Sequence, residues 1–169
     1  TYYVFDGAKG VYVEDDPVSP LSVYARTKVH AEQATLRFSS HLVVRPSKVY
    51  SFKNDARNFL ARLLADATAG KEISVTDDQF TNPISSDDLA LSIKALLDGH
   101  ASGIYHVGGP DTVSNFLFAL EAAAIFGFTP SLIIPQSSEQ AGAAAARPKR
   151  CVLNRDKFIK ETGFQPKGI

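Results

Sequence analysis

The stretch "VYARTKVHAEQATLRFSSHLVVRPS" (residues 23–47) joins a helix-forming run to a continuous apolar run. Ser22 stands just before the first run and offers a side-chain oxygen to cap a helix, so we predict a helix from there to about Phe38. The second run, residues 41–47, has the unbroken apolar centre of a parallel strand that is covered on both faces. A helix followed by such a strand is typical of α/β folds.

The rest of the chain repeats this alternation. A polar loop with two prolines, residues 8–20, is predicted before Ser22. Serines and glycines bound most of the other predicted helices, where they act as caps and stops. Predicted helices are 56–70, 85–99, 114–127 and 154–164, and predicted strands are 1–7, 72–75, 103–109 and 131–135. This order predicts an α/β fold with a mainly parallel sheet.

Composition excludes several classes of protein. Of 169 residues, 44% are hydrophobic and 21% charged, and the 18 Lys and Arg balance the 18 Asp and Glu. There is no basic stripe for a nucleic acid, and no run long enough to span a membrane. The single cysteine, Cys151, excludes an internal disulfide framework and provides no metal cluster. We expect a cytoplasmic protein with no metal and with neither a nucleic acid nor a membrane as partner.

The beginning of the chain leads to a separate expectation. The sequence contains no methionine and opens on "TYYVFDG" (1–7), an apolar, aromatic run that stops at Asp-Gly. We interpret this run as a buried strand that is already under way. We therefore expect the chain to be the interior of a longer protein.

Tyr24 and Lys28 are four residues apart in the first predicted helix, so both side chains point to the same side. A cation beside a phenol favours the phenolate, and a phenol tuned in this way can give a proton to a carbonyl. The spacing alone is equally compatible with an exposed surface pair, because Tyr and Lys both reach water easily.

The flanking residues favour the chemical interpretation. The opening run and the segment from Pro20 to Glu32 resemble two motifs of the extended short-chain dehydrogenase/reductases. The branch that they resemble most contains dTDP-4-dehydrorhamnose reductase and the methionine adenosyltransferase regulatory beta subunit. The matching residues are Thr1, Tyr3, Val4, Phe5, Asp6 and Gly7, then Pro20, Tyr24, Thr27, Lys28 and Glu32.

The resemblance continues to the end of the chain. It includes "LVVRPSKVY" (42–50), "QFTNPISSDDLA" (79–90), "GIYHVGG" (103–109) and the ending from "ARPKRC" to "GFQP" (146–166), in the family's order. Several motifs in the right order are far more specific than one Tyr-x-x-x-Lys. The resemblance implies the C-terminal part of a Rossmann-type parallel sheet with a small substrate-binding lobe, without the Gly-rich N-terminal half.

The resemblance also implies a division of the chain. Residues 1–50 would be the C-terminal strands and catalytic helix of the Rossmann domain. Residues 51–169 would be mainly the substrate-binding lobe, with 103–127 returning to the Rossmann sheet.

Catalytic roles follow from the resemblance. Tyr24 would be the general acid that protonates the substrate oxygen. Lys28 would lower the pKa of Tyr24 and hydrogen-bond the nicotinamide ribose, so that these two residues also bind the cofactor, NADP or NAD. Thr1 would hold the substrate carbonyl through its hydroxyl group.

Substrate-binding roles are implied for three further residues. Arg147 would meet a nucleotide diphosphate, since a guanidinium fork matches phosphate oxygens; a solvated loop arginine is the alternative. Gln79 and Asn82 would hydrogen-bond a sugar or a base, although amides in turns often bond only the backbone.

Three departures separate this chain from the family pattern. Tyr2 stands where an Asp usually follows the catalytic Thr. Lys48 replaces a frequent aromatic residue, and Ser51 a frequent glycine, which leaves the identity of the sugar open. No G-x-G-x-x-G fingerprint is present, and the glycine pair in "VGGPD" (107–111) lacks its spacing.

Two functions are therefore compatible with the sequence. One is an NADP-dependent (or NAD-dependent) reductase of a nucleotide-linked 4-keto sugar, of which this chain is a fragment inactive alone. The other is a non-catalytic regulatory or binding subunit with the same fold. For the reductase we expect a nucleotide-sugar substrate. In either case we expect an exposed sheet edge, which would pair with a second copy or with another chain.

Overall fold

The computed structural model describes residues 1–53, 58–142 and 145–169. The predicted α/β fold is confirmed, and four of the five strand pairs are parallel. The helices are α1 (Val23–Thr35), α2 (Phe59–Thr68), α3 (Ser86–Asp98), α4 (Asn115–Phe126) and α5 (Asp156–Thr162), with 3₁₀ turns η1 (Tyr2–Val4) and η2 (Pro130–Leu132). The first residues of the helix predicted at 56–70, Ala56 and Arg57, lie outside the described residues.

The strands are short, and each pairs with one that is distant in sequence. The pairs are β1 (Gly10–Tyr12) with β10 (Cys151–Leu153), β2 (Leu42–Pro46) with β7 (Gly103–Val107), β3 (Val49–Tyr50) with β6 (Ile84–Ser85), β4 (Ile73–Thr76) with β9 (Ile133–Gln136), and β5 (Phe80–Thr81) with antiparallel β8 (Val113–Ser114).

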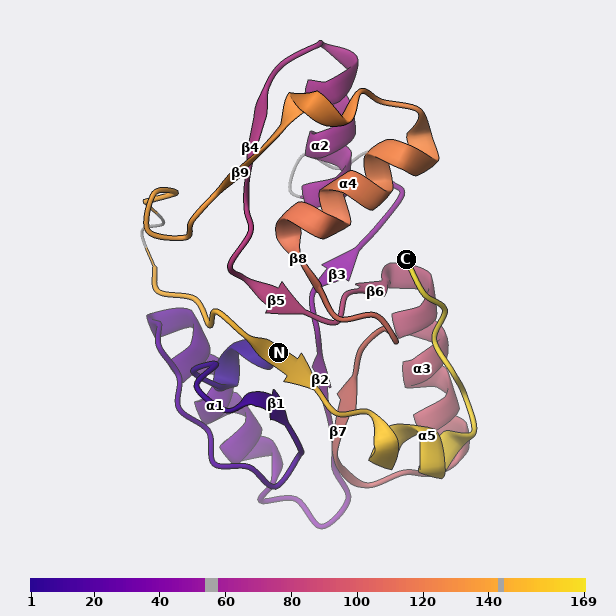
Figure 1. Cartoon of the computed structure of the whole chain (residues 1–169). Helices are drawn as coiled ribbons and strands as arrows, with labels where there is room; N and C mark the ends of the chain where they lie inside the picture. The colour runs from indigo at the N-terminus through magenta and orange to yellow at the C-terminus, as the bar shows by residue number, and fades with distance from the viewer. Residues whose placement is uncertain (54–57, 143–144) are drawn as a thin grey trace.

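These elements form two packed regions (Figure 1). In the upper region of the view, α2 and α4 pack on β4 and β9 around a core that includes Leu63 and Phe118. In the lower region, η1, α1, β1 and β10 surround Phe5, while α3, β7 and α5 surround Phe158. In the described part of the chain, no helix is long and apolar enough to cross a bilayer.

Helix starts follow the local signals in the sequence. The hydroxyl groups of Ser22, Ser85 and Ser114 accept hydrogen bonds from backbone N–H groups three residues on, at 3.0–3.2 Å. Each serine therefore satisfies one of the free N–H groups at a helix N-terminus. Gly127 ends α4 with a φ of 73°, a left-handed conformation that glycine adopts without steric cost.

The opening run is not a strand, which corrects the prediction for residues 1–7. Residues Tyr2–Val4 form the 3₁₀ turn η1, in which the Thr1 hydroxyl accepts a bond from the Tyr3 N–H at 3.4 Å. The aromatic and apolar side chains are buried as expected, but the backbone bonds are local, from Val4 to Thr1 and from Phe5 to Tyr2. Burial alone does not separate a strand from a turn.

Two other boundaries differ from the prediction. Strand β1 lies within residues 8–20, which were predicted to be a loop; it consists of three residues and pairs with β10 about 140 positions away. Helix α5 begins at Asp156, with Arg155 at the cap position. Asn154, the first residue of the predicted helix 154–164, lies before the helix and accepts a bond from the Asp156 N–H at 2.8 Å.

The glycine pair at 108–109 is explained by a close backbone approach. A Cβ atom at Gly109 would lie 2.0 Å from the carbonyl oxygen of Pro83, and one at Gly108 would lie 2.5 Å from Nδ2 of Asn82. The Asn82 amide bonds both backbone groups of Leu153, at 2.9 and 3.0 Å. Asn82 therefore joins the segment after β5 to β10, and the glycines leave room for it.

A buried ion pair fastens α1 to β2. Nη2 of Arg45 lies 2.9 Å from Oε2 of Glu32, and Nε of Arg45 bonds both carboxylate oxygens. Nη1 of Arg45 donates to the backbone oxygen of Glu14 at 3.1 Å and lies 3.4 Å from Nε2 of His106. With 3% of its surface exposed, Arg45 is compensated in full by these partners.

His106, on β7, completes this network. The backbone N–H of His106 donates to the Glu14 carboxylate at 2.9 Å, and the ring Nδ1 lies 3.2 Å from the Tyr12 carbonyl oxygen. Because an arginine N–H only donates, Nε2 accepts and Nδ1 carries the proton. Burial and the adjacent Arg45 lower the pKa of His106 to about 3, so the ring is neutral near pH 7.

Gly109→Ala should destabilise the protein by about 1–3 kcal/mol, since the new methyl group cannot fit beside the Pro83 carbonyl without a backbone shift. Urea denaturation followed by circular dichroism measures the change. Gly99→Ala is the matched control, because the nearest atoms to its Cβ would be the Ala95 and Leu96 oxygens at 3.4 and 3.8 Å and its φ is −79°. Equal stability of both variants would contradict the close approach.

Stability should fall as the pH decreases below about 6.5. Between pH 6.5 and 3 the unfolded chain protonates His106 whereas the folded chain does not, so the free energy of unfolding decreases as the pH falls. His106→Gln should have a shallower pH dependence between pH 7.5 and 5 in urea denaturation. His30→Gln, on the exposed side of α1, should keep the slope of the unmodified protein. Identical slopes for His106→Gln and the unmodified protein would refute the assignment.

Candidate active site

Helix α1 carries Tyr24 and Lys28 on an exposed face next to its buried residues. Ala25 and Val29 face the interior, whereas 51% of the Tyr24 surface is exposed. The Lys28 ammonium lies 5.5 Å from the centroid of the Tyr24 ring, so the two side chains are neighbours across one helical turn. The Tyr3 ring meets Tyr24 edge-on at 6.0 Å and supports it from η1.

Tyr24, Lys28 and Thr1 line one hollow of about 370 Å³. Glu32 of α1 and residues of β2 form the rest of its wall. The structure thus brings the three residues with expected catalytic roles to one concave surface. Thr1 lies at the start of η1, and Tyr24 and Lys28 lie on α1. An exposed surface pair far from Thr1 is not what the structure contains.

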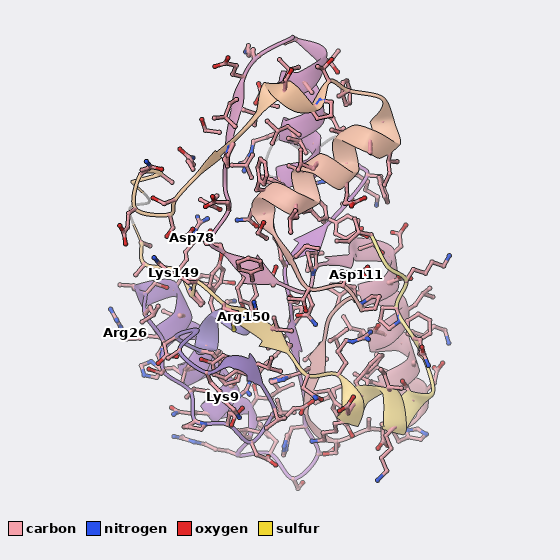
Figure 2. The ribbon with its side chains drawn as sticks, viewed as in Figure 1. Lys9, Arg26, Asp78, Asp111, Lys149 and Arg150 are labelled. Atoms are coloured by element: carbon pink, nitrogen blue, oxygen red, sulfur yellow. The ribbon has the colours of Figure 1, made fainter. Side chains whose placement is uncertain are left out.

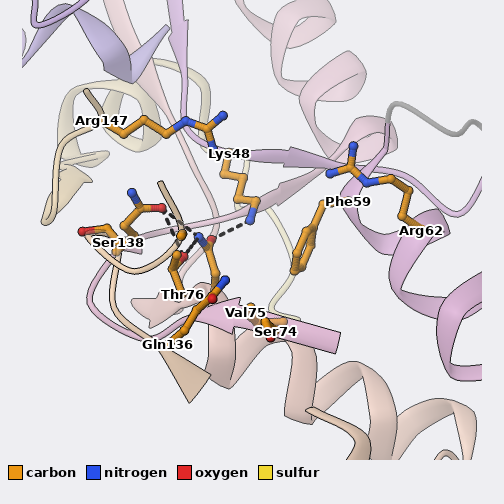
Figure 3. A pocket seen from close by; sticks show the side chains of 12 residues that line it. Lys48, Phe59, Arg62, Ser74, Val75, Thr76, Gln136, Ser138 and Arg147 are labelled. Carbon is orange, nitrogen blue, oxygen red and sulfur yellow. Dashed lines mark hydrogen bonds between the residues drawn. The ribbon is translucent and has the colours of Figure 1, made fainter. Parts of the chain in front are cut away.

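A second cavity, of about 270 Å³, holds Gln79 and Arg147 (Figure 3). It lies where β4, α2, α4 and the loop before β10 meet. Gln79 is buried, and its Oε1 accepts bonds from Thr76 at 3.1 Å and Asn115 at 3.2 Å. Its remaining amide hydrogens are suited to a polar ligand.

Arg147 links the two hollows. Besides the second cavity, it lines a smaller hollow of about 170 Å³ together with Tyr3, Ser22 and Tyr24. A ligand that reaches from Tyr24 to Gln79 would therefore pass Arg147.

The loop that carries Arg147 is tethered by Lys149, two residues further on. Nζ of Lys149 lies 3.3 Å from the Asp78 carboxylate, and Asp78 also accepts bonds from the N–H and hydroxyl groups of Ser138 (Figure 2). Because Asp78 immediately precedes Gln79, these contacts set the distance between Arg147 and Gln79.

Asn82 is not brought to this surface. Both atoms of its amide bond the backbone of Leu153, and Nδ2 is also 3.3 Å from the Gly109 carbonyl oxygen. Asn82 is 2% exposed and does not line the cavity that contains Gln79. Asn82 therefore has a structural position. Of the two interpretations given for this amide, a ligand contact or bonding to the backbone, the contacts match the second.

The second cavity contains cationic residues to which the sequence had assigned no binding role. Lys48 and Arg62 line it, and Nζ of Lys48 donates to Oδ1 of Asn115 at 2.5 Å. Burial lowers the pKa of Lys48 to about 7, and the nearby guanidinium groups of Arg147 and Arg62 contribute to this shift. The signal in the sequence was Lys48 itself, a charge directly after the buried strand β2.

Two further features of the described residues concern metal ligands and the cysteine. Among them, no three His, Cys, Asp or Glu side chains come close enough together to hold a metal ion. The buried Cys151 has a pKa raised to about 12 by burial, so it is an unreactive thiol.

Several known proteins similar to this chain are named as reductases of dTDP-linked sugars. The chain is 30% identical over 169 residues to a dTDP-4-keto-6-deoxy-D-glucose reductase of Streptomyces niveus, covering 98% of this chain and 58% of that protein. It is 31% identical to a dTDP-4-dehydrorhamnose reductase of Sinorhizobium fredii, covering 98% and 59%. The chain therefore spans somewhat more than half the length of these relatives.

Solved structures similar to this chain include enzymes that act on dTDP-linked sugars. The fold matches a dTDP-4-dehydrorhamnose reductase of Bacillus anthracis in complex with NADP, with a TM-score of 0.89 and 29% identity over 99% of this chain and 59% of the other. It also matches a dTDP-glucose 4,6-dehydratase of the same organism with a TM-score of 0.79, at 20% identity, which supports the fold alone. The Rossmann-type architecture expected from the resemblance is thus confirmed.

The family model described as "RmlD substrate binding domain" matches residues 1–168. The match covers the helix with Tyr24 and Lys28, the cavity with Gln79 and the C-terminal segment with Arg147. The chain belongs to the RmlD substrate-binding domain family.

Proposed function

We propose that this chain supplies the substrate-binding and proton-donating part of an NADP-dependent reductase that acts on a nucleotide-linked 4-keto sugar. The observation that carries the proposal is the shared hollow of Thr1, Tyr24 and Lys28, joined through Arg147 to a polar cavity. The family membership and the names of the relatives support the same reaction class.

In this proposal Tyr24 donates a proton to the oxygen of the ketone as the carbon is reduced. Lys28 stabilises the resulting phenolate, since an ammonium near a phenol favours its charged form. The Thr1 hydroxyl holds the carbonyl oxygen within reach of Tyr24, and this bond is stronger when negative charge develops on the oxygen.

The polar cavity would hold the rest of the substrate. Arg147 lines this cavity and the small hollow beside Tyr24, so its guanidinium can meet the diphosphate between the sugar and the base. Gln79 would orient a sugar or base by its amide. Asn82 is left out of this site, because its amide already bonds the backbone.

The residues fit one end of a nicotinamide cofactor. NADP would supply hydride to the ketone carbon. The hollow offers an ammonium and a phenol for the nicotinamide ribose, from Lys28 and Tyr24. The sequence has no G-x-G-x-x-G loop to surround a pyrophosphate, so this chain provides only a small share of the contacts.

Tyr24→Phe should lower kcat by about 10²–10⁴, because it removes the proton donor and keeps the ring. NADPH oxidation with a nucleotide-linked 4-keto sugar measures this in the protein that contains the chain. Tyr50→Phe is the control: Tyr50 is 7% exposed and packs against Phe118 in the upper core, away from the hollow. Unchanged turnover in Tyr24→Phe would assign Tyr24 to packing.

The 169-residue chain alone should bind NADPH more weakly than micromolar. Lys28 and Tyr24 offer one or two charge-assisted hydrogen bonds of about 1.5–3 kcal/mol each, which do not offset the entropy of association to that extent. Isothermal titration calorimetry with NADPH tests this. Micromolar binding would place the main cofactor site within the chain and overturn the assignment.

A further inference from the structure

The cavity that contains Lys48 carries charge of one sign. Lys48, Arg62 and Arg147 line it, and no Asp or Glu is among the described residues of its wall. Figure 3 shows Lys48 between the side chains of Arg147 and Arg62. Like charges this close repel one another, so the set is favourable only when an anion lies among them.

The amine of Lys48 is held in a defined place. It lies 3.9 Å from the centroid of the Phe59 ring and donates to Oδ1 of Asn115. Asn115 is itself oriented, since its Nδ2 donates to Thr76 at 2.7 Å and to Gln79 at 3.2 Å. This packing makes Lys48 part of a built site, unlike a freely moving surface lysine.

Lys48 has unused hydrogen-bonding capacity. An ammonium carries three N–H donors, and Asn115 is the one hydrogen-bond acceptor that the structure describes for it. The other polar side chains of the wall include the amides of Gln79 and Gln136 and the hydroxyls of Thr76 and Ser138, all uncharged. Among the described residues no anionic acceptor is available for these donors, so an anionic ligand would complete their bonds.

We propose that Lys48 binds an anionic oxygen group of the substrate, a phosphate or a carboxylate, at the junction of Arg62 and Arg147. This assignment rests on the proposed function, because it names one group of the nucleotide sugar. The resembling family often has an uncharged aromatic residue at this position. A lysine recognises charge, so the preferred substrate differs from one that presents only hydroxyl groups there.

Binding should also be linked to proton uptake. The free Lys48 has a pKa of about 7 and is mainly neutral at pH 8. An anion beside it favours the ammonium, and the charged groups that face it from α2 and from the loop, Arg62 and Arg147, do not titrate in this range. A ligand with the proposed group therefore brings up to one proton into the complex.

Isothermal titration at pH 8 of the 169-residue chain tests the proposal with three probes. These are thymidine, which has no anionic group, dTDP-glucose and dTDP-glucuronic acid; the last two differ only at C6, which is a hydroxymethyl group in the first and a carboxylate in the second. Lys48→Gln should weaken the binding of a ligand that carries the proposed anionic group about tenfold or more. If both nucleotide sugars weaken equally, the group is a phosphate; if only dTDP-glucuronic acid weakens, it is the carboxylate.

Two further variants separate binding from structure. Lys48→Arg keeps a positive charge at this position and should keep the affinity for the ligand. It should abolish the proton uptake, because an arginine is already protonated at pH 8. The proton uptake is measured as the difference between the binding enthalpies in Tris and in HEPES buffers. Lys71→Gln, an exposed lysine after α2, should change neither quantity. Circular dichroism of each variant checks the fold.

The proposal is overturned if neither nucleotide sugar binds, or if Lys48→Gln binds both as tightly as the unmodified chain. It is also overturned if Lys48→Arg loses affinity as Lys48→Gln does, since that result assigns Lys48 to packing. The titration needs no turnover, so a chain that fails as a reductase can still pass it, and an active reductase can still fail it.

Discussion

The ion pair between Arg45 and Glu32 is the contact on which the arrangement of the site depends. It joins β2 to α1, and through Glu14 and His106 it reaches the segment after β1 and strand β7. Removing one partner from a buried pair leaves an uncompensated charge, at a cost of about 3–5 kcal/mol. Glu32 lies one turn after Lys28 on α1, so the pair holds the part of the helix that carries Tyr24 and Lys28 against β2.

The chain separates its two polar regions by their chemistry. Around Arg45, opposite charges and a neutral imidazole satisfy one another, and the region is closed to water. Around Lys48, the charges have one sign and the neutral partners leave donors unused. The first pattern is that of a structural network, whereas the second is that of a binding site, since a ligand is needed to complete it.

Local signals in the sequence were sufficient for much of this fold and part of the site. Ser85 and Ser114 marked their helices because capping involves neighbours in the chain. Tyr24 and Lys28 were recognised from a motif, and the structure places both in one hollow with Thr1.

Features that depend on distant partners were not predictable in this way. Asn82 bonds residues 27 and 71 positions away, so an amide that looked available to a ligand is in fact occupied. Strand β1 was not predicted because three residues are too few to show an alternation of apolar and polar side chains. Its partner also lies near the other end of the chain. The cavity of Lys48, Arg62 and Arg147 likewise exists only after β4, α2 and the loop before β10 have come together.

The pairing of β1 with β10 also has a consequence for biosynthesis. None of the five described strand pairs is a hairpin, and residues 10–12 have no partner until 151–153 have left the ribosome. Contacts of such long sequence separation form slowly, because the loop entropy is lost before the strands gain their bonds. Tyr2, Phe5 and Tyr12 share one buried cluster with Cys151 and Leu153, so this cluster cannot be completed before the last strand has been synthesised.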